Sequence, residues 1–340
     1  MAETVANLIH RSNPPSVQLA GYNGALSPLQ VDSMKKLAVT VFLLALAQGC
    51  QDGGQPPVST QGTSAPRLMS QWPVIFYIPH PDDEAIGMAG GIREHVEAGR
   101  PVYLVLITDG LNSCLRAMMN SEPLGPGLSE CDFSDNIANC PLYVPSNPSA
   151  HPADHNHGMS EENIGMMRRV ELLNSARVLG VKDVFIEDVG KGFGDAEIAS
   201  SPQLVADIIK KFEARFPGAS HKVPSGAYDI VQDDEGNCGA PNGAHKAIWD
   251  GAVLVKAEGL ITDFKGYRIY HHLSPNPCNT TPPETVDISA WMTYKRASID
   301  QYRLWDPDSG RFALGQHSLQ PSGMLDDAYL SNFEYRDSLP

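Results

Sequence analysis

One histidine and three carboxylates follow a short apolar segment in the run Val74-Ile-Phe-Tyr-Ile-Pro-His-Pro-Asp-Asp-Glu84. Imidazole nitrogens and carboxylate oxygens bind Zn²⁺, and a catalytic zinc site typically uses three protein ligands and leaves one position for water. His80 and Asp83 could bind one ion from a single turn, and Asp82 would then be free to act as a base. The pattern predicts half of a catalytic metal site. An ordinary strand-to-helix junction, with an aspartate as the helix cap, is the alternative.

This run resembles the opening motif of the PIG-L/LmbE-like family of zinc-dependent N-acetylglucosaminyl deacetylases. The motif is Pro79-His-Pro-Asp-Asp-Glu84, and the similarity continues in Ile86-Gly-Met-Ala-Gly-Gly91, Val102-Tyr-Leu-Val-Leu-Ile-Thr-Asp-Gly110 and Arg168-Arg-Val-Glu171. It extends in widely spaced blocks from residue 74 to residue 272. The resemblance implies Zn²⁺ as cofactor and a hydrolase that removes an acetyl or other acyl group from an N-acetylated sugar or glycoconjugate.

The resemblance also implies roles for individual residues. His80 and Asp83 match the first two zinc ligands of the family, and Asp82 matches its general base. The third ligand of the family is the second histidine of a His-Pro-Asp-His segment. The matching segment here reads Pro241-Asn-Gly-Ala-His-Lys246, so His245 aligns with the third ligand.

Asn242 stands where the family has the first histidine of that segment. An asparagine can donate a hydrogen bond to an oxyanion in the substrate-binding site, but it cannot deliver a proton at neutral pH. This departure predicts either another proton donor or weak turnover. His271 or His272 could supply the function, although strand alternation lets only one of them face the site. The alternative for both is an ordinary polar residue at the end of a strand.

Arg168 matches the substrate-positioning arginine of the family. Its planar guanidinium suits the hydroxyl groups of a sugar or a nearby phosphate. A solvated helix face that Arg168 shares with Arg169 is the other interpretation, and the sequence leaves both open.

Apolar segments and helical periodicities alternate along the chain. Strands are predicted at residues 74–78, 102–108, 183–187, 228–232 and 266–271. Helices are predicted at residues 89–98, 161–179, 202–215 and 244–258, and a closing amphipathic helix within 286–305. This alternation is typical of a Rossmann-like α/β fold, a mostly parallel sheet flanked by helices, with the metal site at the C-terminal strand ends. Asp109 and Asp188 also follow strands: Asp109 is expected to hold its loop, and Asp188 matches an acidic family position only with a shift.

Residues 34–50 combine a cationic start with a short apolar core that ends at Cys50, which is the pattern of a bacterial export signal. The segment resembles a lipoprotein signal, with a buried helix as the alternative. Residues 1–33 are then a non-native or disordered extension, residues 51–71 a flexible linker, and residues 72–340 the deacetylase-like domain. The predicted location is extracytoplasmic, as a membrane-anchored lipoprotein or a secreted bacterial protein.

Five cysteines remain when Cys50 is set aside, so at most two disulfides form. The predicted pairs are Cys131 with Cys140 and Cys238 with Cys278. Residues 111–160 form a long insertion without clear periodicity, for which we expect a substrate-recognition loop. Within it, residues 151–157 (His-Pro-Ala-Asp-His-Asn-His) favour a solvated loop over a second metal cluster.

The formal net charge of −15 argues against nucleic acid as a partner, because affinity for nucleic acid comes mostly from cationic contacts to phosphates. Residues 307–340 are predicted to form an irregular C-terminal segment.

Two further functions stay open. One is a non-catalytic carbohydrate-binding lipoprotein, suggested by Asn242. The other is a metal phosphoesterase, whose two-metal forms need more metal-binding side chains than this sequence offers in order.

Overall fold

The computed structural model describes residues 72–108, 110, 115, 119–120, 158–187, 195–226, 228–232, 238–271, 278, 281–306, 309–319 and 324–338. The predictions for segments 1–33, 34–50 and 51–71 lie outside these residues, as do those for most of the insertion and for Asp109, Asp188 and His272. Among the described residues, no helix has the length and apolar content needed to span a membrane.

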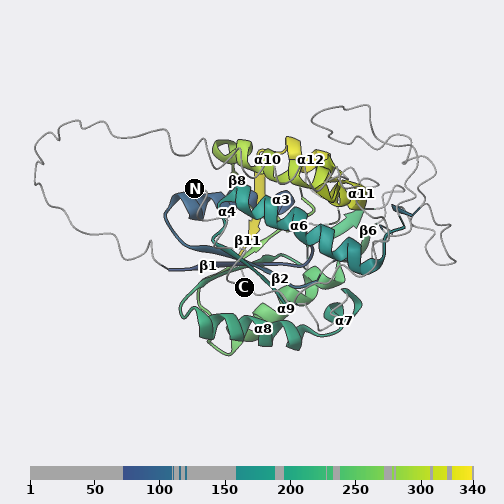
Figure 1. Cartoon of the computed structure of the whole chain (residues 1–340). Coiled ribbons are helices and arrows are strands. Elements are labelled where there is room, and N and C mark those ends of the chain that lie inside the picture. Colours follow the sequence, from purple (N-terminus) through teal and green to yellow (C-terminus); the bar gives the residue numbers. More distant parts are fainter. Residues whose placement is uncertain are drawn as a thin grey trace, which may run out of the picture. The chain divides into compact units, whose positions relative to one another are not determined.

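The described residues form a seven-stranded sheet in the order β3-β2-β1-β4-β7-β11-β8 (Figure 1). Five neighbouring strands are parallel: β1 (Val74–Ile78), β2 (Val102–Leu106), β3 (Asp183–Ile186), β4 (Ser220–Pro224) and β7 (Phe264–Tyr267). The remaining two pair in antiparallel fashion, β11 (Phe333–Asp337) with β7 and β8 (Glu284–Asp287) with β11. The prediction of a mostly parallel sheet flanked by helices is confirmed.

The central strand, β1, is buried on both of its faces, and its alternate side chains enter two different cores. One core lies under α4 (Ala89–Glu97), α6 (Glu161–Leu179) and α10 (Met292–Arg303). The other lies under α8 (Pro202–Arg215) and α9 (Gly243–Ala257), on the opposite face of the sheet (Figure 1). Because both faces of the strand are covered, the sequence of β1 is apolar at consecutive positions, as is usual in parallel sheets.

The order of the strands reverses between β1 and β4. From β1 the chain proceeds to β2 and β3 on one side, and later to β4 and β7 on the other. Residues 79–82 lead from β1 into α3 (Asp83–Gly87), and β4 leads to α9 through the hairpin of β5 (Ile230–Gln232) and β6 (Cys238–Pro241). The C-terminal ends of β1 and β4 therefore border the point at which open α/β sheets bind ligands.

Two segments differ from the predictions. The strand predicted at 228–232 lies in the separate β5–β6 hairpin, and the parallel strand at this place in the sheet is β4. Its sequence, Ser220-His-Lys-Val-Pro224, has no apolar run, yet it is buried. Its histidine and lysine have partners: His221 contacts Tyr77 Oη at 3.0 Å and Glu213 at 2.9 Å, and Lys222 donates to Asp263 at 3.3 Å. The C-terminal segment is also not irregular throughout, since it forms α11 (Leu314–Leu319), α12 (Met324–Leu330) and β11.

A disulfide joins Cys238 in β6 to Cys278, which confirms this predicted pair. The pair predicted between Cys131 and Cys140 lies outside the described residues. The two bonded cysteines are 40 residues apart, and both α9 and β7 lie between them. The bond therefore ties the segment that enters α9 to the segment that follows β7.

Replacing Cys238 and Cys278 by serine is expected to lower the free energy of unfolding by about 4 kcal/mol, because the cross-link restricts a long loop of the unfolded chain. Chemical denaturation of the wild type and the variant, with and without reductant, measures the difference. Reduction should bring the wild type to the stability of the variant. A wild-type midpoint that does not change under reductant would contradict the expectation.

Candidate metal centre

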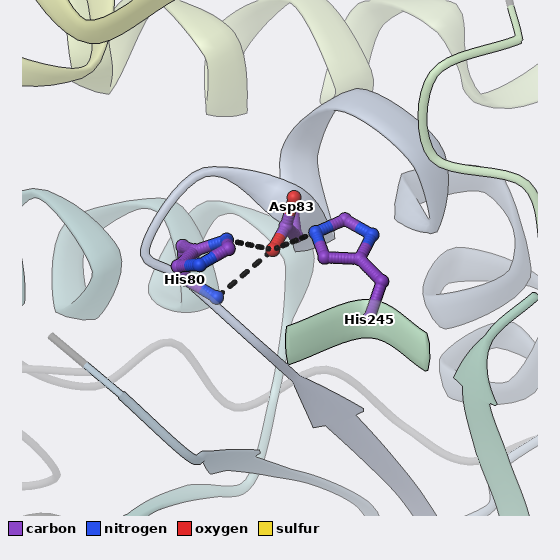
Figure 2. A group of neighbouring side chains, drawn as sticks. All are labelled: His80, Asp83 and His245. Carbon is purple, nitrogen blue, oxygen red and sulfur yellow. Dashed lines mark hydrogen bonds and ion pairs between the residues drawn. The ribbon is translucent and has the colours of Figure 1, made fainter. Parts of the chain in front are cut away.

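Three predicted ligands from two distant segments meet at the C-terminal end of β1 (Figure 2). His80 Nδ1 lies 3.2 Å, and His245 Nε2 lies 3.4 Å, from the same oxygen of Asp83, Oδ2. The three potential ligand atoms all lie within 4.8 Å of one another. The side chains of Asp83 and His245 are buried, whereas that of His80 is 12% exposed, so solvent reaches the group at His80.

These residues fit a divalent cation such as Zn²⁺. Two ligand atoms that each lie about 2.1 Å from a tetrahedral ion are about 3.4 Å apart. The distances from both histidine nitrogens to Asp83 Oδ2, 3.2 and 3.4 Å, are close to this value. Histidines with one carboxylate are also a donor set of catalytic zinc sites, which keep the fourth position for water or substrate.

Asp229 orients the ring of His245. Its Oδ2 lies 2.9 Å from His245 Nδ1, and its Oδ1 accepts the backbone N–H groups of Ile269 and Tyr270 at 2.7 and 3.3 Å. A carboxylate beside one ring nitrogen holds the proton there and leaves the other nitrogen for an ion, which is the usual arrangement of metal-binding histidines. Asp229 was not among the predicted site residues, because a lone aspartate outside a motif has no characteristic spacing.

The charges of the group favour a cation. Burial by itself would lower the pKa of His245, but Asp83 and Asp229 outweigh this effect and raise that pKa to about 9. Burial would raise the pKa of Asp83, but His245 and His80 hold it well below its usual range. A proton on His245 thus compensates the buried carboxylates where a divalent cation would otherwise do so.

Asp82, on the same turn, has an unusual backbone conformation. Its φ of 122° is uncommon for a residue with a side chain, and its N–H donates to Glu84 Oε2 at 3.2 Å. Its carboxylate accepts a hydrogen bond from Arg168 Nη2 at 3.0 Å. Burial raises the pKa of Asp82 to about 7, against the lowering effect of Arg168. A carboxyl group of this kind is suited to take up a proton and to return it.

The guanidinium of Arg168 is engaged within the protein. Besides Asp82, it donates to the carbonyl oxygens of Pro81 at 2.9 Å and Gly110 at 2.8 Å, and the residue is 2% exposed. A Cβ at position 110 would collide with this guanidinium, which explains why a glycine ends the segment Val102–Gly110. The interpretation of Arg168 as part of a solvated helix face is therefore wrong. Its predicted contact with substrate stays a prediction.

Glu84 anchors the turn after β1 to the helices α6 and α10. Its Oε1 accepts hydrogen bonds from the hydroxyl groups of Ser175 in α6 at 2.5 Å and Tyr302 in α10 at 2.6 Å. Burial raises the pKa of Glu84 to about 7 despite these hydrogen bonds. The two hydroxyl partners lie 91 and 218 residues away in the sequence, so no local pattern could have indicated this role.

Asn242 caps α9 and contacts an aromatic residue of the centre. Its Oδ1 accepts the backbone N–H groups of Ala244 and His245 at 3.0 and 3.2 Å. Its Nδ2 lies 3.2 Å from Tyr270 Oη, and this hydroxyl lies 3.2 Å from His245 Nε2. Tyr270 was not predicted as a site residue, and it is the side chain by which the segment after β7 reaches the metal centre.

His271, one residue further along, was predicted as a possible substitute proton donor. Its ring packs instead against Tyr335 of β11, with 4.4 Å between the ring centroids. Burial lowers the pKa of His271 to about 4, so this imidazole is neutral at physiological pH. The second candidate, His272, lies outside the described residues.

Residues 75–221 match the family model described as GlcNAc-PI de-N-acetylase, PIG-L. A comparison with curated proteins found no significant match. Three solved structures are similar at low level. The first is GalB, the 4-carboxy-2-hydroxymuconate hydratase of Pseudomonas putida, with 16% identity over 79% of this chain and 97% of that chain and a TM-score of 0.44. The second is the N,N'-diacetylchitobiose deacetylase of Pyrococcus horikoshii, with 18% identity over 79% and 84% and a TM-score of 0.45. The third is the teicoplanin deacetylase Orf2, with 12% identity over 78% and 96% and a TM-score of 0.43.

Structural similarity at this level does not distinguish a hydratase from a deacetylase. The family match is more informative, because it contains His80, Asp82, Asp83 and Arg168, while His245 lies beyond its end. Residues 75–221, less than half of the chain, thus match the PIG-L (LmbE-like) family, and this match confirms the resemblance that the motifs indicate.

Proposed function

We propose that the protein is a metal-dependent amide hydrolase that removes an acetyl or related acyl group from an N-acetylated sugar or glycoconjugate. The observation that carries this proposal is the meeting of His80, Asp83 and His245 on a turn that also holds a buried carboxylate, Asp82. The description of the matching family, GlcNAc-PI de-N-acetylase, supports the reaction type.

In this proposal, His80, Asp83 and His245 hold the cation, which the family resemblance indicates to be zinc. When bound, a zinc ion lowers the pKa of a coordinated water to about 7 and polarises an amide carbonyl. Asp82 takes one proton from the water as the water oxygen bonds to the acyl carbon. When the C–N bond breaks, Asp82 returns this proton to the departing nitrogen. The products are a carboxylic acid and a free amine.

Arg168 and Glu84 position Asp82 for this role. Arg168 binds the carboxylate of Asp82, whereas Glu84 binds its backbone N–H, so both ends of the residue are fixed. All three residues are buried. Their arrangement is therefore set before a substrate arrives, which is how a protein avoids the cost of reorganising polar groups during the reaction.

The family description and the charge of the chain support the proposed class of substrate. With a net charge of −15, the protein would repel highly anionic polymers, whereas neutral N-acetylated sugars and glycoconjugates meet no such barrier. We also keep the export signal predicted at residues 34–50 as part of the proposal. A protein exported in this way would act on extracytoplasmic glycans or secreted conjugates.

Asn242 motivates a second candidate, a carbohydrate-binding protein without catalytic turnover. The side chain caps α9 and cannot deliver a proton to a departing amine at neutral pH. A protein that binds zinc and N-acetylated sugars, yet releases no acetate from them, would favour this second candidate.

Asp82→Asn is expected to lower acetate release by about 10²–10⁴-fold, because an amide cannot take the proton of the attacking water. Its zinc content should remain that of the wild type, because Asp82 is not one of the three grouped ligands. Acetate release from N-acetylglucosamine oligomers and metal analysis of the purified full chain test both parts.

His245→Gln is expected to lose both zinc and activity, and His95→Gln is its matched control, since His95 lies in α4 and outside the ligand group. Incubation with a chelator should abolish wild-type activity, and added zinc should restore it. Acetate release that survives the chelator and the Asp82→Asn change would contradict the proposed function.

Arg168→Met is expected to lower the free energy of unfolding by about 3 kcal/mol, because it leaves a buried carboxylate without its cationic partner. Arg169→Met changes the neighbouring, less buried arginine and should cost about 1 kcal/mol or less. Urea denaturation measures both. Adding Asp82→Asn to Arg168→Met should recover part of the loss, and equal effects of the two arginine variants would count against this role.

A further inference from the structure

The N-terminal ends of the parallel strands form one edge of the domain, opposite the metal centre. Arg100 Nε donates to the carbonyl oxygen of Trp72 at 3.0 Å, so the segments that precede β1 and β2 lie side by side there. The backbone N–H of Lys182 donates to the carbonyl oxygen of Val102 at 2.8 Å, which places the start of β3 beside them. The helices α6 and α8 also end at this edge, because each is closely followed by a strand, β3 and β4. We call this surface the N-terminal edge, and its side chains include Trp72, Arg100, Arg177, Lys182, Arg215 and Leu260.

Four cations of the N-terminal edge have no acidic partner among the residues that the structure describes. Three of them contact neutral groups: an amide for Arg177 and aromatic rings for Lys182 and Arg215. The guanidinium of Arg100 contacts a carbonyl oxygen and the ring of His95. Burial and nearby cations lower the pKa of His95 to about 3, so this ring is neutral as well. The charges of the four side chains are therefore not neutralised within the described part of the protein.

The acids near the N-terminal edge are mostly paired with other cations. Glu97, Glu258 and Asp263 each form an ion pair with a lysine or an arginine. Asp183 and Glu213 have no such partner among the described residues, and they accept hydrogen bonds from backbone N–H groups. The four uncompensated cations thus exceed the uncompensated acids. The edge carries a local positive surplus in a chain whose formal net charge is −15.

Two large apolar side chains are exposed on the same edge. Trp72 is 54% exposed and Leu260 is 48% exposed. Tryptophan is enriched where a protein meets the interface between membrane and water, because its ring is apolar while its N–H needs a polar partner. Cations beside such apolar side chains are typical of surfaces that bind anionic lipids. The combination fits a lipid headgroup layer better than an anionic polymer, which would need the cations alone.

The chain also enters the domain at this edge. Trp72 follows residues 51–71, which the sequence predicts to be a flexible linker after the lipidation site at Cys50. A flexible linker of this length spans on the order of 25 Å. A lipid at Cys50 would therefore keep the domain close to a bilayer, but the linker by itself would leave the domain free to rotate. The N-terminal edge supplies a surface that could fix the orientation.

We propose that the N-terminal edge rests on an anionic phospholipid surface, so that the metal centre points away from the bilayer. The central strand, β1, separates the two ends of the sheet by about 17 Å. This length exceeds the Debye length of about 10 Å at 0.1 M salt, so the acids around the metal centre are screened from the lipid. The local charge of the edge then decides the interaction, and not the net charge of the chain. The inference goes beyond the proposed function and does not depend on turnover.

A protein that begins at residue 64 allows the edge to be tested without the predicted export signal, whose apolar core would bind lipid by itself. Residues 64–340 form a compact unit that is separate from residues 1–63. This unit contains the whole sheet, both cores and the disulfide, so it folds without the preceding segment. Circular dichroism and the thermal midpoint check that each variant below keeps this fold.

Vesicles of phosphatidylcholine with and without phosphatidylglycerol are the probe, and cosedimentation measures binding. Arg177→Gln together with Lys182→Gln is expected to weaken binding to the anionic vesicles by about 25-fold, because each cation near the lipid contributes roughly 5-fold. Lys211→Gln together with Lys246→Gln is the matched control. It removes two exposed cations whose ammonium groups contact Glu187 and Asp250, away from the edge. The control should weaken binding by about 2-fold or less, because its charges are screened from the lipid.

Trp72→Ala tests the apolar part of the edge without a change of charge. It is expected to weaken binding to the anionic vesicles by at least about 5-fold, because the indole ring would lose its contact with the lipid. Leu330→Ala is the matched control. Leu330 is 61% exposed, but it precedes β11, which runs antiparallel to β7 and so begins at the opposite end of the sheet. The control should bind as the wild type does.

Equal binding to vesicles with and without phosphatidylglycerol would overturn the inference, as would equal weakening by the edge variants and their controls. Binding to dextran sulfate without binding to vesicles would also overturn it, because the edge would then meet an anionic polymer. Arg177→Gln with Lys182→Gln should release acetate from soluble substrate at the wild-type rate. A protein that releases no acetate, but binds anionic vesicles through this edge, would reject the proposed function alone.

Discussion

The turn after β1 depends on a hydrogen bond between the backbone N–H of Asp82 and the buried side chain of Glu84. This bond holds Asp82 at a φ of 122°, a conformation that costs on the order of 1–3 kcal/mol for a residue with a side chain. Glu84 can provide the restraint because Ser175 and Tyr302 fix its other oxygen from two different helices. As a result, two adjacent aspartates have different partners. Asp83 faces the two histidines, whereas Asp82 faces Arg168. A ligand and a base can thus occupy neighbouring positions in the sequence without competing for the same role.

Buried charge is the second constraint on the centre. Three carboxylates, Asp82, Asp83 and Asp229, are buried close together, and unpaired charges in such a place cost several kcal/mol each. Arg168 compensates Asp82 directly. His245 lies between Asp83 and Asp229. Its imidazole ring can compensate their negative charge only while it carries a second proton. A divalent cation at the three ligands would supply the same compensation and leave the ring neutral. The buried charges that are costly without compensation are therefore those that would favour binding of a metal ion.

The parts of the fold that local sequence determines were predictable. The helix at 161–179 has its predicted bounds because Ser160 caps its first turn and Gly180 ends it in a left-handed conformation. β4 was not predictable, because its buried histidine, His221, is paired with Tyr77, which lies 144 residues away in the sequence. The same distinction holds in the centre. The ligands His80, Asp83 and His245 belong to motifs with recognisable spacing, and the structure brings them together. Asp229 and Tyr270 belong to no such motif, and their importance comes only from the atoms that the fold places beside them.

The centre consists of two parts, each held together by its own contacts. The first is the turn after β1, which Glu84 and Arg168 attach to α6 and α10. The second is the start of α9 with the segment after β7, which Asp229 and the Cys238–Cys278 disulfide hold together. Within the ligand group, His245 Nε2 and Asp83 Oδ2 are 3.4 Å apart and belong to different parts. Because each part is held by its own contacts, an ion at this junction would need no refolding of either one. Ion binding would then stabilise the native state according to the free ion concentration relative to its dissociation constant, because the unfolded chain cannot bring the two parts together.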